Sequence, residues 1–328
     1  MSAVNELRSR IRGFIQHPRW LNPLLQDAPN WNMLCSSFDT VADTEMAIKT
    51  YEAMPDVEDV GARYLAIYGI LQCLYVQQDA VESLVRAFAP GTQPVYRIES
   101  EPEADEVRKI RNKAIGHPTK EGDVNSKKRP GVQMSHFIMQ HSMHKCGFKL
   151  MTTFADKTHA FTDVSITELI AKNRTVVERV LVRIMQKLEA AEMEHRMAFK
   201  EEKLADLFPV TLDYYFEKVF AGADNPGSPD GQWGGIHLKM VAEKVRLFRE
   251  AIQKRGLVNG SSNWEYYLAE VEYPLQELLS YWVGSGSLTD RRAAEIFAYF
   301  LRDKVLKLRE SAQDLDEEYK EELDGHAP

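Results

Sequence analysis

Apolar residues recur along most of the chain at the three- and four-residue steps of amphipathic helices. The pattern is strongest over residues 57–88, where apolar side chains occupy nearly every face, as in the central helix of a bundle or a dimer seam. A very long helix is predicted over residues 166–207, with a coiled-coil-like seam that contains Asn173. Such a seam either pairs with the same helix of a second copy or packs inside one chain.

Shorter helices are expected over residues 4–16 and 38–53, separated by a proline-punctuated connector from Pro18 to Pro29. Residues 222–235 are rich in Gly, Asn, Pro and Asp, which predicts a linker. Three further helices are expected toward the C-terminus, over residues 236–255, 264–282 and 288–322.

Strand-like composition occurs over residues 132–140 and 148–154, with turn-forming residues between them, and predicts a β-hairpin. The fold class is therefore mainly α, a helical bundle with one small β-hairpin and additional long C-terminal helices. We expect three regions: a helical domain with an N-terminal arm, then the hairpin with the long helix, then a C-terminal helical region. These regions span residues 1–131, 132–222 and 223–328.

Charge is unevenly distributed along the 328 residues. The whole chain carries a net charge of −8, yet residues 108–129 contain eight Lys or Arg against two acids, a local excess of +6. Such an excess in an acidic chain favours phosphate-bearing partners.

The remaining composition is ordinary for a globular protein, with 44% apolar and 27% charged residues. No apolar run approaches the length of about 18 residues that a membrane span needs. Arginines at positions 8, 10 and 12 interrupt the N-terminal segment, so a signal peptide is not expected. Three widely spaced cysteines indicate reduced thiols, and a cytoplasmic location is expected.

The basic region is centred on the end of a well-marked helix. Ser100 and Glu103 have the spacing of a capping box at the start of this helix. Gly116 suits the residue just past the helix, and Pro118 disfavours helical geometry for the residue before it. The sequence therefore predicts that the helix ends within the segment Arg111–Pro118.

Helical geometry places Val107, Ile110 and Ala114 in one narrow apolar stripe. Arg111 falls at one edge of this stripe and His117 falls near the other edge. This pair suits RNA cleavage without a metal. A neutral imidazole can take the 2′-hydroxyl proton or return a proton to the leaving oxygen, while a guanidinium holds the phosphate and stabilises its developing charge.

Arg111-Asn112, four intervening residues and His117 resemble the signature of the HEPN superfamily, over roughly residues 30–130. The resemblance implies a small helical bundle and a metal-independent endoribonuclease that leaves 2′,3′-cyclic phosphate ends. It further implies a homodimer in which two Arg–His pairs share one composite cleft, with Asn112 orienting the pair or contacting the phosphate. By the same resemblance, a role in prokaryotic antiviral defence or growth arrest is expected, with a regulatory protein or antitoxin as a further partner.

Other residues near the motif refine this hypothesis. HEPN toxins that pair with nucleotidyltransferase antitoxins often carry a Tyr two residues after the His, and here that position is Thr119, which argues against modification by that route. Residues expected to contact the RNA backbone are Lys113, Lys120, Lys127, Lys128 and Arg129. No cofactor is implied, and no metal is expected, because no strong zinc pattern joins His136, His141, His144 and Cys146.

Three points stay open. An Arg and a His at a helix end also serve as partners of the helix dipole. A HEPN-like bundle can also be a non-catalytic binding or scaffold protein that recognises nucleic acid, a nucleotide or a protein partner. Likewise, Asp79 and Glu82 on the preceding helix either orient Arg111 or His117, or belong to a solvated face.

Overall fold

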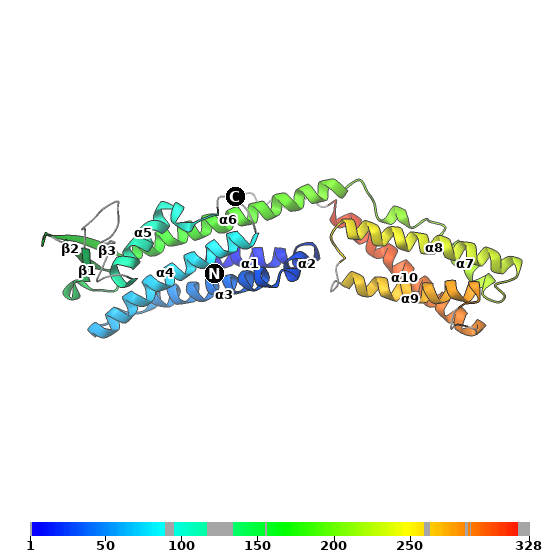
Figure 1. Ribbon diagram of the computed structural model, residues 1–328, viewed down its shortest axis with the longest axis horizontal. Coiled ribbons are helices and arrows are strands. Elements are labelled where there is room, and N and C mark those ends of the chain that lie inside the picture. Colours follow the sequence, from blue (N-terminus) through cyan, green and yellow to red (C-terminus); the bar gives the residue numbers. More distant parts are fainter. Residues whose placement is uncertain are drawn as a thin grey trace. The chain divides into compact units, whose positions relative to one another are not determined.

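The fold is described from a computed structural model (Figure 1), which confirms a mainly helical chain with a small antiparallel sheet. Internal contacts divide the chain into two compact units. Unit 1 consists of Met1–Phe14 and Leu24–Lys187, and unit 2 consists of Ile15–Pro23 and Leu188–Pro328. The residues that the structure describes are 2–88, 95–116, 134–154, 156–258, 263–285, 288 and 290–320.

Unit 1 is a helical bundle capped by the sheet. The long helices α3 and α4 pack against each other along their length, and α5 and the first part of α6 complete the bundle. Ile48, Leu71 and Val107 lie in their shared core and are inaccessible to solvent. The helical elements of this unit are α1 (Ala3–Ile15), α3 (Ala28–Ala53), α4 (Val60–Phe88), η1 (Ile98–Ser100), α5 (Pro102–Arg111), η2 (Asn112–Gly116) and α6 (Ile166–Phe199).

The sheet has strand order β1-β2-β3, with β1 (Met134–Ile138), β2 (Gly147–Phe154) and β3 (His159–Ser165) all antiparallel to their neighbours. The short 3-10 turn η3 (Gln140–Ser142) lies between β1 and β2. The predicted hairpin is β1–β2. The third strand was not predicted because Val164 is its one buried residue, so β3 carries almost no apolar alternation and is held by backbone pairing to β2.

The inward face of the sheet contributes Phe148, Leu150 and Val164 to the core of unit 1. The boundary expected at residue 131 therefore falls inside a compact unit rather than between two. The boundary expected at residue 222 falls inside unit 2, because α7 (Leu212–Gly222) packs along α8 (Pro229–Lys254). The units are defined by contacts between elements on either side of these positions, which composition does not reveal.

Two segments expected to be irregular are largely helical. The connector from Pro18 to Pro29 is α2 (Pro18–Gln26) followed by the start of α3, whose first turn is capped by Asp27 through the backbone amide of Asn30 at 3.2 Å. The second half of the predicted linker 222–235 is the first turns of α8. In both places proline occupies the first turn of a helix, where its missing N–H has no helical partner to lose.

The glycines of the predicted linker have a packing role. A Cβ at Gly234 would lie 2.9 Å from the carbonyl oxygen of Lys218 and 3.2 Å from the Cα of Gly222. A Cβ at Gly222 would lie 2.7 Å from the carbonyl oxygen of Asp230. Glycine at these positions lets the backbones of α7 and α8 approach closely, which is why a glycine-rich segment is helical here.

Unit 2 has its own core, which includes Phe216, Phe248, Leu301 and other residues of its four long helices. Helix α6 ends at Phe199, earlier than predicted, and the chain turns where the amides of Leu204 and Ala205 donate to the Asp316 carboxylate at 2.8 and 2.9 Å. Beside α7 and α8, this unit contains η4 (Ala205–Leu207), α9 (Asn263–Val283) and α10 (Arg291–Glu318).

The predicted seam of α6 packs inside the chain. Asn173 is fully buried, donates to the Gln77 side chain at 2.6 Å and accepts from the Gln78 side chain at 2.8 Å, both on α4. The predicted capping box at the start of α5 is not formed. Glu103 instead contacts Arg179 on α6 at 3.1 Å, and Ser100 donates to the carbonyl oxygen of Arg97 within its own turn.

Among the described residues, no helix combines the length and apolar character needed to cross a membrane. The three cysteines, Cys35, Cys73 and Cys146, are free thiols.

Candidate functional site

The described part of the motif lies where α5 changes into the π-helical turn η2. Arg111 is the last residue of α5, and Asn112 begins the π turn that ends at Gly116. The predicted apolar stripe is confirmed, since Val107 and Ala114 are buried and Arg111 lies half-buried beside them. Single π turns inside helices are frequent at functional sites, because the extra residue redirects the side chains around it.

The Arg111 guanidinium is held by two side-chain amides. Its Nε and Nη2 donate to the Oε1 of Gln72 on α4, at 3.1 and 2.7 Å. Its Nη1 donates to the Oδ1 of Asn112 at 3.0 Å. Three of the five guanidinium N–H groups are therefore directed by neutral acceptors.

An aromatic ring and a glycine complete this environment. The guanidinium carbon of Arg111 lies 4.4 Å from the ring centroid of Tyr75, and that of Arg108 lies at the same distance from the same ring. Both contacts have cation–π geometry. A Cβ at Gly116 would lie only 2.7 Å from the Nη1 of Arg111, so the absence of a side chain there leaves room for the guanidinium.

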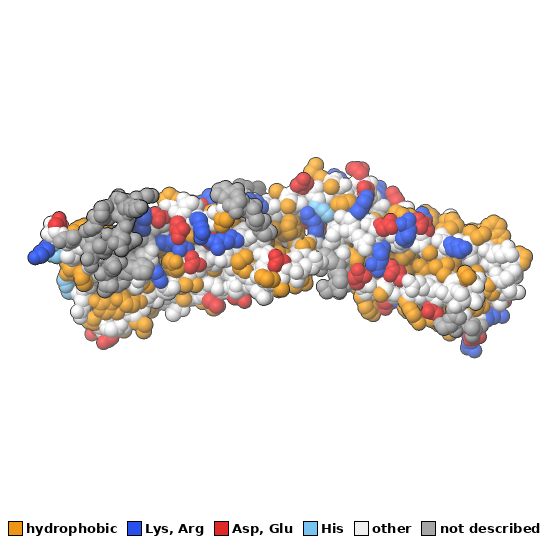
Figure 2. All heavy atoms as spheres, in the orientation of Figure 1, with side chains coloured by type: hydrophobic (Ala, Val, Ile, Leu, Met, Phe, Trp, Pro, Cys, Tyr) orange, Lys and Arg blue, Asp and Glu red, His pale blue; other side chains and the backbone are white. Residues whose placement is uncertain are grey.

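Among the described residues, Arg108 and Lys109 have acidic partners and Arg111 does not. Arg108 pairs with Asp79 and Glu99, and Lys109 pairs with Asp105 at 2.5 Å. Within the described residues, no carboxylate lies within ion-pair distance of Arg111. Figure 2 shows acidic and basic side chains next to each other over α5 and α6, so ion pairs are common in this region, whereas the described residues supply none to Arg111.

The two acids considered as partners of the motif have other roles. Asp79 contacts Arg108 rather than Arg111. Glu82 is buried, accepts a hydrogen bond from the backbone amide of Ile98 at 2.7 Å, and pairs with Arg86 and Arg97. Neither acid orients Arg111, and Glu82 is not on a solvated face.

Several predicted site residues lie outside the described part of the chain, which omits residues 117–133. Lys113 is described and lies half-buried on η2. The residues outside the description are His117, Lys120, Lys127, Lys128 and Arg129.

Sequence reasoning missed Gln72 and Tyr75, the two α4 residues that position Arg111. Their spacing of three residues places them on one face of α4. That spacing was the available signal, since a glutamine and a tyrosine share a face within an otherwise apolar stretch. The pattern of one helix does not give the rotation of the next helix against it, so the pairing with Arg111 required the structure.

The histidines of the sheet region have separate partners. His136 is buried on the inward face of the sheet and shares a hydrogen bond with the hydroxyl of Thr152 at 3.0 Å. His144 accepts from the backbone amide of Cys146 at 3.2 Å. The described residues contain no group of three or more His, Cys, Asp or Glu side chains that could hold a metal ion.

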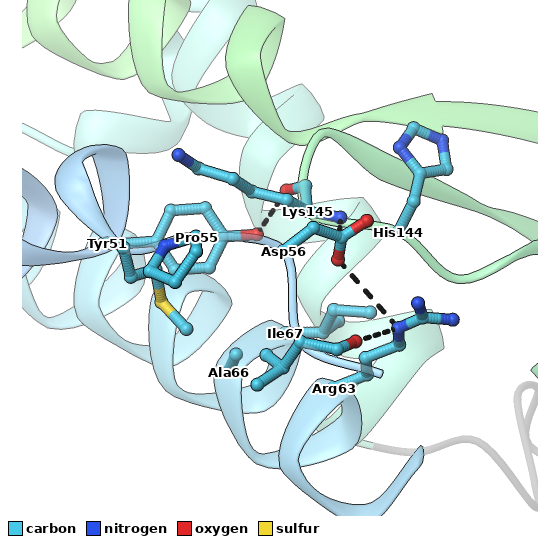
Figure 3. Close-up of a pocket in the computed structure, with 10 residues that line it drawn as sticks. Tyr51, Pro55, Asp56, Arg63, Ala66, Ile67, His144 and Lys145 are labelled. Atoms are coloured by element: carbon cyan, nitrogen blue, oxygen red, sulfur yellow. Dashed lines mark hydrogen bonds and ion pairs between the residues drawn. The ribbon is translucent and has the colours of Figure 1, made fainter. Parts of the chain in front are cut away.

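A small cavity of about 10 Å³ lies between the α3–α4 turn and the β1–β2 connection (Figure 3). The Tyr51 hydroxyl donates to the carbonyl oxygen of Lys145 at 2.6 Å, and the Lys145 amide donates to Asp56 at 3.1 Å. Burial raises the pKa of Tyr51 to about 12. A cavity of this size has room for about one water molecule, so these contacts attach the sheet to the bundle and do not form a ligand site.

Comparisons with known proteins find no relative: no protein-family model matches the chain, and neither does any curated protein or solved structure.

Proposed function

We propose that this protein is a metal-independent endoribonuclease that acts as a homodimer. Arg111 binds the scissile phosphate and stabilises the charge that develops on it, and His117 is the general acid/base. The observation that carries this proposal is the Arg111 guanidinium, which is fixed by Gln72, Asn112 and Tyr75 and has no carboxylate partner among the described residues.

Such an arrangement suits an anionic ligand. A guanidinium held in place before the ligand binds loses little side-chain freedom on binding, and an unneutralised cation attracts phosphate more strongly than one in an ion pair. Two terminal N–H groups of Arg111, one on Nη1 and one on Nη2, are not engaged by described residues. They supply the paired donors that a phosphate accepts in bidentate fashion.

Arg108 is an arginine on the same helix whose charge is neutralised by acidic side chains. It lies one turn earlier, stacks on the same tyrosine and is neutralised by Asp79 and Glu99. If Arg111 served only to stabilise the fold, an acidic partner would be expected beside it, because a half-buried unpaired charge is unfavourable. The neutral partners of Arg111 therefore favour a role in ligand binding.

The test is cleavage of a labelled single-stranded RNA in EDTA by the wild type, Arg111→Ala and His117→Ala. Loss of a general acid/base lowers the rate about 10²–10⁴-fold, and loss of a transition-state donor lowers it about 10²–10³-fold. Arg12→Ala is the matched control, because Arg12 lies on the exposed surface of unit 1 and contacts Asp39 at 3.4 Å. A probe with 2′-deoxy nucleotides should stay intact, since it lacks the attacking hydroxyl.

Mixing the two inactive variants tests the homodimer. A composite cleft that takes Arg111 from one copy and His117 from the other regains partial cleavage in the mixed dimer, whereas two separate sites stay inactive. If the wild type binds RNA in EDTA without cutting it, the non-catalytic binding function replaces the enzymatic one. Equal RNA affinity in the wild type and both variants would show that Arg111 and His117 contribute neither to cleavage nor to RNA binding.

A further inference from the structure

The outward face of the small sheet carries a row of three apolar side chains, of which the two phenylalanines are exposed. Strand alternation directs Phe148 and Leu150 into the core and leaves Phe137, Met151 and Phe161 on the opposite face. The register pairs Phe137 with Met151 and Met151 with Phe161, so the three side chains form one row across all three strands. The exposed fractions of Phe137 and Phe161 are 50% and 57%.

Polar groups border this row on both sides. Toward one end of the strands, the Thr153 hydroxyl and the Nδ1 of His159 share a hydrogen bond at 3.1 Å. Toward the other end, Lys149 lies 3.5 Å from Asp163, in an exposed pair that is weak in water. The face therefore presents two exposed aromatic rings, with hydrogen-bonding and charged side chains at both ends of the row.

We propose that this face binds single-stranded RNA by stacking bases on Phe137 and Phe161. Exposed aromatic rings on a small antiparallel sheet form a stacking surface for unpaired bases, because every base has a planar face that is hidden in a duplex. The inference rests on the proposed ribonuclease function for the choice of RNA, and it assigns to this face the recognition of unpaired bases.

Charge and position favour a nucleic acid over a protein partner. In a chain of net charge −8, residues 134–165 contain three lysines against two aspartates and no glutamate. Strand β1 is an edge strand and lies against η2, the turn that follows Arg111. A strand of RNA whose bases stack on β3 and β1 therefore continues toward the end of α5, where the Arg111 guanidinium is held.

The test measures affinity apart from cleavage, by fluorescence anisotropy with a labelled single-stranded RNA that carries 2′-O-methyl groups and cannot be cut. The double variant Phe137→Ala/Phe161→Ala should raise the Kd at least about tenfold, because two stacked bases are lost. A double Phe→Leu variant keeps the apolar volume, removes the rings and should also bind weakly, whereas a double Phe→Trp variant should bind as well as the wild type. Leu65→Ala is the control, since Leu65 is 75% exposed on α4 of the same unit.

Each outcome has a defined meaning. Annealing the probe to its complement should weaken binding, because pairing hides the base faces. An unchanged Kd in both the alanine and leucine double variants overturns the proposal, as does an absence of wild-type binding at about 100 µM protein. If sedimentation shows that the double variants lose a dimer while the Kd stays the same, a second copy of the chain covers this face and the proposal is overturned.

Failure of this inference and failure of the proposed function are distinguishable. A wild type that binds the probe through the phenylalanines but leaves unmodified RNA intact supports the stacking face and contradicts the ribonuclease. A wild type that cuts RNA, with double variants that bind the probe equally well, contradicts the stacking face alone. Circular dichroism of all variants checks that the sheet is intact.

Discussion

Arg111 and Arg108 lie one turn apart on α5 and stack on the same tyrosine, yet their other partners differ in charge. The sequence motif predicted that Arg111 and Asn112 lie at a helix end, and the structure shows the hydrogen bond between their side chains. The motif could not predict the contact with Gln72, because this residue is 39 positions earlier in the sequence and reaches Arg111 only through the packing of α4 on α5.

Gly116→Ala separates the position of Arg111 from the stability of the fold. The new Cβ would overlap the Nη1 of Arg111 and displace the guanidinium from its partners, while alanine favours helical backbone by up to about 1 kcal/mol and so offsets the lost contacts. We expect a nearly unchanged melting temperature together with RNA cleavage reduced about 10–100-fold, because small misplacements of a positioned group lower rates strongly.

The matched control for this substitution is Gly69→Ala on α4, where an added Cβ meets no atom within 4 Å. Cleavage by this variant should equal that of the wild type. If Gly116→Ala cleaves at the wild-type rate, the orientation of Arg111 seen here is not the one that matters for activity.

At the scale of elements, α6 is joined to the rest of unit 1 by buried polar groups as well as by apolar packing. Gln77 donates to the buried carboxylate of Glu45 at 2.9 Å and accepts from Asn173, which also binds Gln78. The contacts connect α3, α4 and α6 inside the core. The sequence predicted the seam and the polar Asn173 within it. It did not predict the partners of Asn173, because glutamine and glutamate on a helix are usually exposed to solvent.

Asn173→Ala should lower the free energy of unfolding of unit 1 by about 2–4 kcal/mol. The substitution removes the donor to Gln77 and an acceptor of Gln78, and buried polar groups left without partners cost about 1–3 kcal/mol each. Urea unfolding followed by circular dichroism measures this change. Thr175→Ala, an exposed change two residues along α6, should stay within about 0.5 kcal/mol, and a similar loss in both variants would argue against the buried network.

At the scale of the whole chain, each unit has its own core. Helix periodicity predicted most of the helices, because long amphipathic patterns are strong local signals. The units were not predictable in the same way, since unit 2 includes the distant segment Ile15–Pro23 and depends on contacts between residues far apart in sequence. Within unit 2, Arg19 and Trp20 of that segment both contact the buried Glu192 carboxylate.

The stability of unit 2 should fall in acid. Burial, with the charge of Arg19, lowers the pKa of His195 from 6.5 to about 4, while Glu192 opposes this shift and Arg255 adds to it. Unfolded chains therefore bind a proton that the folded unit excludes between these pH values, so the free energy of unfolding decreases as the pH falls from about 6.5 to 4. We expect a loss of about 1–2 kcal/mol, less than the full shift because the ring is partly exposed.

The measurement is urea unfolding between pH 7 and pH 4.5, followed by intrinsic fluorescence. Trp20, Trp233, Trp264 and Trp282 all belong to unit 2, so the signal reports mainly on that unit. His195→Gln keeps a hydrogen-bonding side chain next to the Tyr319 hydroxyl, which lies 2.9 Å from the His195 ring, and should flatten the pH dependence. Identical slopes for the wild type and this variant would contradict the assignment to His195.

The return of the chain to unit 2 also sets an order of events during synthesis. Arg19 and its partner Glu192 are 173 residues apart, and a ribosome adding about 5–20 residues per second needs about 9–35 seconds to make that stretch. Throughout this interval, Ile15–Pro23 has been made without the part of the protein that it packs against, because the ribosome is still adding the residues of unit 1 that lie between them. A chaperone that shields the apolar side of this short segment would therefore act early in translation, long before unit 2 can close around it.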